Sequence, residues 1–82
     1  MRLDKFLKVS RVIKRRTLAK EVCDGGKIMV NGRVAKAGLE VKPGDRVDIQ
    51  IGNRNLSFEI VEIKETVPAK EAASLYKVIA GN

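Results

Sequence analysis

Histidine and tryptophan are absent from this 82-residue sequence, which has only one cysteine, two phenylalanines and one tyrosine. Without histidine, the chain lacks the commonest general base and metal ligand. A single cysteine with dispersed carboxylates does not make a metal cage, and no glycine-rich loop has the lysine spacing of an NTPase. We therefore expect no metal, no cofactor and no enzymatic activity.

Long apolar segments are missing as well. The N-terminal stretch MRLDKFLK has no apolar run of the kind that forms a signal peptide. No segment approaches the roughly 18 apolar residues of a membrane span. One cysteine cannot form an internal disulfide, which fits a reducing compartment. These absences predict a soluble, cytoplasmic protein.

The length of the chain limits the size of its core. A domain of this size buries roughly 60% of the surface that its unfolded chain exposes, so little interior is left for an enclosed active site. The composition is globular, with 44% hydrophobic and 33% charged residues. No repeat or linker divides the sequence, so we expect a single domain over residues 1–82, and a monomer.

Positive charge is present in excess, and it is distributed unevenly. The net charge is +7. Residues 1–36 contain eleven Lys and Arg against three acidic residues, whereas residues 37–82 contain six against seven. All the excess therefore lies in the first half. Such an asymmetry indicates an anionic partner, either a nucleic acid or a membrane surface.

Two amphipathic helices are predicted near the N-terminus. Over residues 3–10, helical spacing places one set of side chains on a single face: Leu3, Phe6, Leu7 and Ser10. Asp4 in the first turn has three possible roles, namely a favourable charge at the helix dipole, an ion pair with Lys8, or the orientation of an arginine. A second helix over residues 15–24 precedes a Gly-Gly pair that ends it, and its apolar side comprises Leu18, Ala19, Val22 and Cys23. We expect Phe6 and Cys23 to be core residues.

The remaining segments alternate in the manner of strands. Asn31-Gly32 is the favoured pair for a tight hairpin turn between residues 28–30 and the segment that resumes at Val34. The sequence KPGD at 42–45 predicts a second turn. Residues 47–51 and the segment from Leu56 onward alternate as half-buried strands. A proline then opens PAKEAASLY, which predicts a short closing helix. The fold class is α+β, with a helical pair packed on a small twisted antiparallel sheet and a short C-terminal helix.

Several of these segments together resemble a known RNA-binding module. RLDKFL, SR, KRRTLAKEV, GGKIMVNG, AKAG and VKPGD follow one another in the order typical of the alpha-L, or S4-type, RNA-binding module. The matched stretch covers about residues 2–48, and a strand pair and a short helix follow it to residue 82. Such modules occur in a small-subunit ribosomal protein, in tyrosyl-tRNA synthetase tails and in pseudouridine synthases. Here no catalytic domain accompanies the module.

The stand-alone form is similar to the heat-shock protein fifteen family, and in its compactness to the RqcP-type members of Gram-positive bacteria. This resemblance implies binding to large-subunit ribosomal RNA and to tRNA on large ribosomal subunits that carry stalled peptidyl-tRNA. It also implies assistance to RqcH in adding alanine tails to the stalled chain. A large-subunit recycling role of the heat-shock type is the alternative within the family, although the long basic extension of that protein is missing here.

The cations in residues 9–20 have a plain interpretation as a solvated surface, but their density and the lack of neighbouring acidic residues favour contact with RNA phosphates. Arginine suits this role because its planar fork binds phosphate oxygens in pairs. The resemblance puts Arg16 first and Arg2 second, both on the exposed side of the helical pair. The supporting RNA-binding candidates are Lys5, Arg11, Lys14, Arg15, Lys20, Asn31 and Lys36.

Two other kinds of anionic partner remain as alternatives. A basic amphipathic helix also binds anionic lipid, although both helices are short and their apolar faces are needed to cover the sheet. DNA binding is a further alternative, without an evident recognition helix or dimerisation segment. With so few aromatic side chains, recognition of a structured RNA by shape and backbone fits better than stacking on single-stranded bases.

Overall fold

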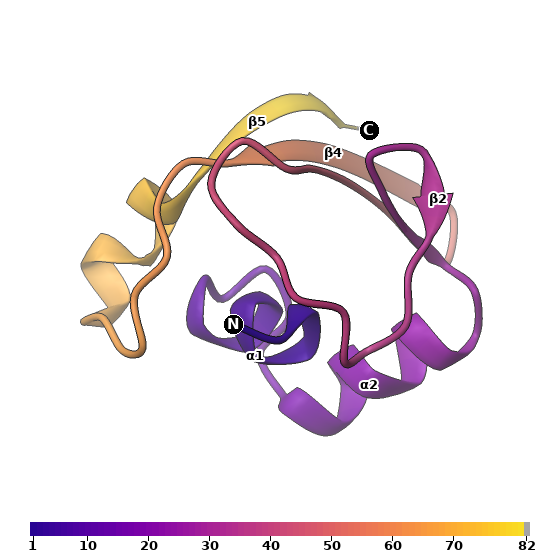
Figure 1. Ribbon diagram of the computed structural model, residues 1–82, viewed down its shortest axis with the longest axis horizontal. Helices are drawn as coiled ribbons and strands as arrows, with labels where there is room; N and C mark the ends of the chain where they lie inside the picture. The colour runs from indigo at the N-terminus through magenta and orange to yellow at the C-terminus, as the bar shows by residue number, and fades with distance from the viewer. Residues whose placement is uncertain (82) are drawn as a thin grey trace.

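The computed structural model describes residues 1–81, and these form three helices and one five-stranded antiparallel sheet, an α+β fold. The two α-helices are α1 (Leu3–Val9) and α2 (Arg16–Asp24). The strands are β1 (Ile28–Val30), β2 (Arg33–Val34), β3 (Arg46–Ile51), β4 (Arg54–Ile60) and β5 (Tyr76–Gly81), and the 3-10 helix η1 (Ala69–Leu75) precedes β5. Their order in the sheet is β2-β1-β3-β4-β5. Figure 1 shows the helical pair lying against one face of the curved sheet.

The first helix buries the face that its spacing predicts. Leu3, Phe6, Leu7 and Ser10 are all buried, and the Ser10 hydroxyl donates to the Leu7 carbonyl oxygen at 3.3 Å. The helix ends at Val9 with Ser10 as its C-cap, and Arg11 just beyond it has a left-handed φ of 61°, so the chain turns away towards α2. In α2, Ala19 and Cys23 are buried as predicted. Leu18 is an exception, since 45% of it is exposed.

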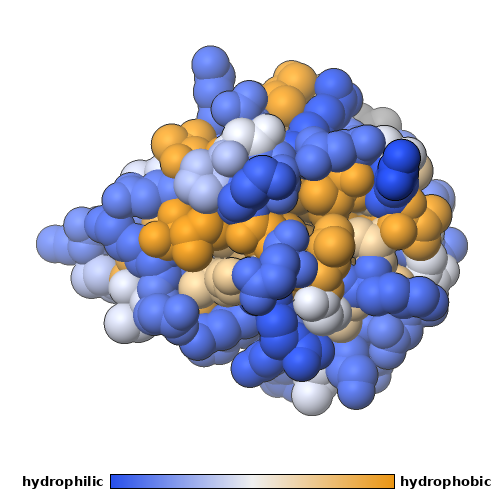
Figure 2. Space-filling view, viewed as in Figure 1, coloured by the Kyte–Doolittle hydropathy of each residue, from blue (hydrophilic) through white to orange (hydrophobic). Residues whose placement is uncertain are grey.

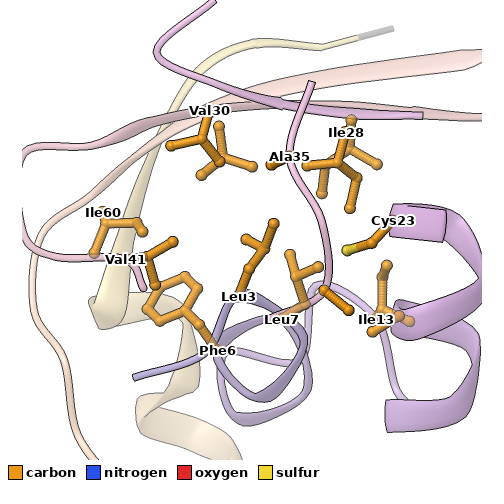
Figure 3. Packing of buried hydrophobic residues seen from close by; sticks show 14 of the residues in the cluster. Leu3, Phe6, Leu7, Ile13, Cys23, Ile28, Val30, Ala35, Val41 and Ile60 are labelled. Carbon is orange, nitrogen blue, oxygen red and sulfur yellow. The ribbon is translucent and has the colours of Figure 1, made fainter. Parts of the chain in front are cut away.

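The hydrophobic core lies between α1 and the sheet, and Figure 3 shows side chains from both layers pointing towards one another. Phe6 of α1 stacks on Phe58 of β4 with ring centroids 6.3 Å apart, and Phe58 contacts Tyr76 of β5 at 5.1 Å. These aromatic contacts join the N-terminal helix to the last two long strands. In the same orientation as Figure 1, Figure 2 shows a band of hydrophobic groups between hydrophilic ones across the middle of the face.

The hairpin turn between β1 and β2 has the predicted geometry. Asn31 and Gly32 both have positive φ, 52° and 83°, as a tight hairpin turn requires. The Asn31 amide is also held from outside the turn. Its Nδ2 donates to Asp45 at 3.1 Å, and its Oδ1 accepts from the backbone N–H of Arg46 at 3.0 Å. The turn is therefore fixed against the start of β3.

The predicted short helix near the C-terminus is present as the 3-10 helix η1, and an unpredicted strand, β5, follows it. This strand pairs with β4 in antiparallel register from Ile60↔Tyr76 to Leu56↔Gly81, with a bulge between Ser57 and Phe58. The sequence YKVIAG gave no indication of a strand because it does not alternate. As an edge strand, β5 leaves every residue after Tyr76 exposed, so no buried face imposes a period of two.

Candidate nucleic-acid interface

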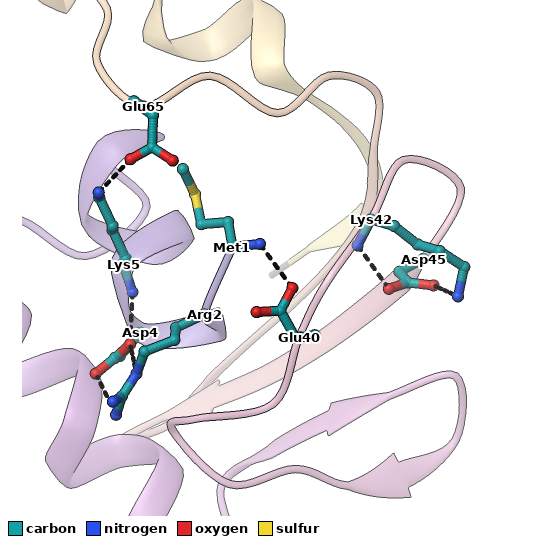
Figure 4. Close-up of polar contacts among 8 residues, drawn as sticks. All are labelled: Met1, Arg2, Asp4, Lys5, Glu40, Lys42, Asp45 and Glu65. Carbon is teal, nitrogen blue, oxygen red and sulfur yellow. Dashed lines mark hydrogen bonds and ion pairs between the residues drawn. The ribbon is translucent and has the colours of Figure 1, made fainter.

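A buried carboxylate organises the basic end of the helical pair. Asp4 in the first turn of α1 is 2% exposed. Arg2 donates to it through Nε at 3.2 Å and through Nη2 at 3.4 Å, and the backbone N–H of Lys5 donates at 2.8 Å. Arg16, the first residue of α2, places its Nε 3.5 Å from Oδ2 of Asp4, the oxygen that also accepts from Arg2 Nη2. Figure 4 shows the Arg2 guanidinium against Asp4. Two of the three roles considered for Asp4 fit the structure, because it lies in the first turn of α1 and contacts two arginines.

This arrangement holds two guanidinium groups side by side at the surface. The side chains of Arg2 and Arg16 are each 50% exposed, whereas the Asp4 side chain is 3% exposed. A buried carboxylate needs such partners because an unpaired charge in the interior is strongly destabilising. Each guanidinium carries five N–H donors, and Asp4 accepts from only part of them. Donors therefore remain for the oxygens of a phosphate, and the pair keeps a net positive charge.

A basic cleft opens beside this pair. Its volume is about 260 Å³, and it is lined by Lys5, Lys8, Arg11 and Arg16 on one side and by residues 65–67 on the other. The ammonium group of Lys5 forms a hydrogen-bonded ion pair with Glu65 (Figure 4). The hydrogen bond and charge of Lys5 lower the pKa of the Glu65 carboxyl below its ordinary value. Three of the residues predicted from the sequence thus come together, and Lys8, which the prediction did not include, joins them.

Three other predicted cations lie outside this cleft. Lys14 is exposed in the loop between the helices, Arg15 is the N-cap residue of α2, and Lys20 is exposed on α2. Lys14 and Arg15 precede Arg16 in the sequence, and Lys20 follows it in the second helix. Their contact with RNA stays a prediction.

Asn31 and Lys36 line a separate groove of about 670 Å³ beside the β1–β2 hairpin. The same groove contains Arg33 and Lys42, two cations that the sequence analysis did not single out. The Asn31 side-chain amide is hydrogen-bonded to Asp45 and to the backbone N–H of Arg46. Burial raises the pKa of Asp45, but hydrogen bonds from Asn31 and from the backbone N–H of Lys42, together with the Lys42 ammonium, outweigh burial and leave that pKa below its ordinary value. Contact of Asn31 and Lys36 with RNA stays a prediction.

Cys23 is 1% exposed in the core. Burial, followed by the charges of Asp4 and Asp24, raises the pKa of its thiol from 9.0 to about 11. The thiol is thus neutral and inaccessible at neutral pH, in agreement with its predicted role in the core.

Within residues 1–81, none of the helices has the length and apolar character needed to cross a bilayer.

Comparison with known proteins links this geometry to a family. Residues 1–47 match the S4 domain. A protein of Halalkalibacterium halodurans called RQC P-site tRNA stabilizing factor is 63% identical over 78 residues, which cover 95% of this chain and 89% of that protein. The Bacillus subtilis protein of the same name is 53% identical, with 96% and 92% covered.

A solved structure agrees with the fold. The trimeric structure of Vibrio cholerae heat shock protein 15 superimposes with a TM-score of 0.89 at 34% identity, covering 98% of this chain and 82% of that one. Because that relative is described as trimeric, our expectation of a monomer stays a prediction. This chain belongs to the S4 domain family, among the RQC P-site tRNA stabilizing factors and their heat shock protein 15 relatives.

Proposed function

We propose that this protein is an RNA-binding factor of ribosome quality control, which binds large ribosomal subunits carrying stalled peptidyl-tRNA and stabilises the tRNA in the P site. The single observation that carries the proposal is the pair of half-exposed arginines on the buried Asp4, placed in the half of the chain that holds all the excess positive charge. The name shared by two relatives, which refers to a P-site tRNA, gives independent support.

The mechanism follows from fixed positive charge. Ribosomal RNA and tRNA repel each other where their phosphates approach, and cations held on a rigid scaffold between them reduce that repulsion. Arg2 and Arg16 are restrained by Asp4, so little side-chain entropy is lost when they bind phosphate. The protein then holds the peptidyl-tRNA in a productive position. It performs this role as a binding factor in the cytoplasm and catalyses no reaction alone.

The partner in this process is RqcH, which adds alanine residues to the stalled chain while this protein keeps the peptidyl-tRNA in place. A reconstituted tailing assay with stalled large subunits, RqcH and alanine-charged tRNA tests the proposal. Omission of this protein should stop tail elongation, and its addition should restore it. An Arg16→Ala variant that retains its fold should restore it poorly. Normal tailing without the protein would refute the proposal.

A large-subunit recycling role is the second candidate, favoured by the likeness to heat shock protein 15. Sucrose-gradient sedimentation separates it from the first. A tailing factor should remain with subunits that hold peptidyl-tRNA and should be lost when that tRNA is released with puromycin. A recycling factor with no requirement for tRNA should sediment equally with both kinds of subunit.

A further inference from the structure

The segment that follows β4 forms a wall of the basic cleft although it lies outside the S4 match. The match ends at residue 47, and the wall consists of Glu65, Thr66 and Val67. The segment is fixed to the rest of the protein. Ile63 and Val67 pack against the core, and the backbone N–H of Val61 donates to the Leu75 carbonyl oxygen at 2.9 Å. The cleft is therefore built jointly by the S4 helices and by a segment outside the matched module.

The chemistry of the cleft is that of a phosphate site with one acidic residue already in it. Among the described residues that line it, Lys5, Lys8, Arg11 and Arg16 are cationic and Glu65 is the one acid. Glu65 does not lie apart from these cations, since its carboxylate accepts a hydrogen bond from the Lys5 ammonium. A carboxylate and a backbone phosphate are both anionic oxygen acceptors, and each suits an ammonium donor. The two groups therefore compete for the same lysine.

Exposure shows that this internal ion pair can be displaced. The side chains of Lys5 and Glu65 are 38% and 75% exposed, and exposed pairs of this kind contribute little to stability because water and salt screen them. Moving the Glu65 side chain away from Lys5 is thus inexpensive, whereas keeping it there opposes any phosphate that enters the cleft.

We propose that Glu65 is a built-in competitor for RNA: its carboxylate occupies Lys5 in the free protein, and a backbone phosphate of bound RNA replaces it. This inference rests on the proposed RNA-binding function and deepens it. Displacing the carboxylate lowers the affinity for any RNA that places a phosphate at Lys5. Further phosphate contacts, such as one at Arg2 outside the cleft, offset that cost. The acid thus raises the number of phosphate contacts that an RNA needs in order to bind tightly.

The test compares two glutamates of the same segment. Glu65→Gln removes the competitor. Glu62→Gln is the matched control, because Glu62 forms an exposed ion pair with Lys64 at 3.6 Å and does not line the cleft. Both variants raise the net charge by one. Binding is measured by fluorescence anisotropy on a short RNA duplex, and by co-sedimentation on purified large ribosomal subunits that carry peptidyl-tRNA.

We expect Glu65→Gln to bind the duplex about three- to fivefold more tightly than Glu62→Gln at low salt, the scale of one exposed charge pair. The difference should vanish as salt shortens the screening length. In a double-mutant cycle, Lys5→Gln should abolish most of the gain, because the competition is for that ammonium.

Equal affinities of the two variants, or weaker binding by Glu65→Gln, would overturn the inference. Failure of the proposed function is distinguishable from this. A wild-type protein that binds the duplex but not the large subunits would refute the ribosomal role, while the duplex comparison would still decide the role of Glu65. Absence of binding to any RNA at low salt would contradict both.

Discussion

The two halves of this molecule each bury one aspartate, and the two carboxylates are held in different ways. In the helical half, Asp4 depends on the guanidinium groups of Arg2 and Arg16. In the sheet half, Asp45 accepts from the amide of Asn31 and from the backbone N–H of Lys42. The Lys42 side chain is 80% exposed, and its ammonium lies 3.5 Å from Asp45. Asp4 is thus paired with two half-exposed guanidinium groups, and Asp45 with two neutral donors and one largely exposed ammonium group.

The difference shows where stability and function share residues. The arginines that complete the fold around Asp4 are the same ones that we propose for RNA, so they cannot be removed together without a cost to folding. The groups around Asp45 fix the turn between β1 and β2. Residues 1–36, which hold the helical pair and the β1–β2 hairpin, have eight more basic than acidic residues, and residues 37–82 have one fewer. This distribution fits an RNA-binding helical pair on a supporting sheet.

The largest expected effect on stability comes from removing the two cations that pair with Asp4. Arg2→Ala combined with Arg16→Ala leaves a buried carboxylate without a cation, and we expect a loss of about 3–5 kcal/mol in the free energy of unfolding. The matched change in the sheet half, Lys42→Ala, should cost about 0.5 kcal/mol, because Asp45 keeps its other donors. Urea denaturation measures both.

Adding Asp4→Asn to the double arginine variant is the control. Neutralising the carboxylate should restore a large part of the lost stability, because the penalty comes from the unpaired charge. If the free energy of unfolding of the double variant falls by no more than the sum of two small surface effects, the two arginines do not neutralise a buried Asp4 carboxylate as described above.

A variant with a smaller effect on stability distinguishes the part of Arg16 in RNA binding from its part in folding. Arg16→Ala alone leaves Arg2 and the Lys5 N–H on Asp4, so stability should fall by only about 1 kcal/mol. Affinity for large ribosomal subunits should fall about tenfold or more, the scale of one hydrogen bond between charged groups. Lys77→Ala, an exposed cation of β5, should leave that affinity nearly unchanged. Equal losses of affinity for the two variants would mean that net charge alone, and not the position of the cation, determines binding.

A further effect concerns acid stability and belongs to Asp45. The pKa of Asp45 is lowered from 3.8, so its ionised form stabilises the fold above that value, and this contribution is lost as pH falls through the folded-state pKa. Asp45→Asn should be less stable by about 1–2 kcal/mol at pH 7, and the gap to wild type should narrow below about pH 4. A gap that stays constant with pH would contradict the assignment.

The sequence predicted the features that local rules determine. Helical spacing identified the buried face of α1, and Asn31-Gly32 identified the hairpin. The resemblance to the S4 module supplied the family and the fold. The missed elements depend on tertiary contacts. The strand β5 has one paired edge and no buried face after Tyr76, so its pattern gave no indication of a strand.

The candidate site was predicted in part for a similar reason. Its cations were visible as a dense run, but their grouping depends on chain reversal between α1 and α2. Asp4 and Arg16 are twelve positions apart, and Lys5 and Glu65 are sixty apart. No local pattern connects such pairs, so the role of Asp4 as an anchor and the place of Glu65 in the cleft required the structure.

A cryo-EM map of the particle that co-purifies with the tagged protein is the most direct test of the central claim. We predict a large ribosomal subunit with a tRNA in the P site and the helical pair against RNA. Arg2 and Arg16 should lie within hydrogen-bonding distance of phosphate oxygens, and the exposed strand β5 should face away from the RNA. A map in which β5 contacts RNA, while both arginines point into solvent, would contradict the account.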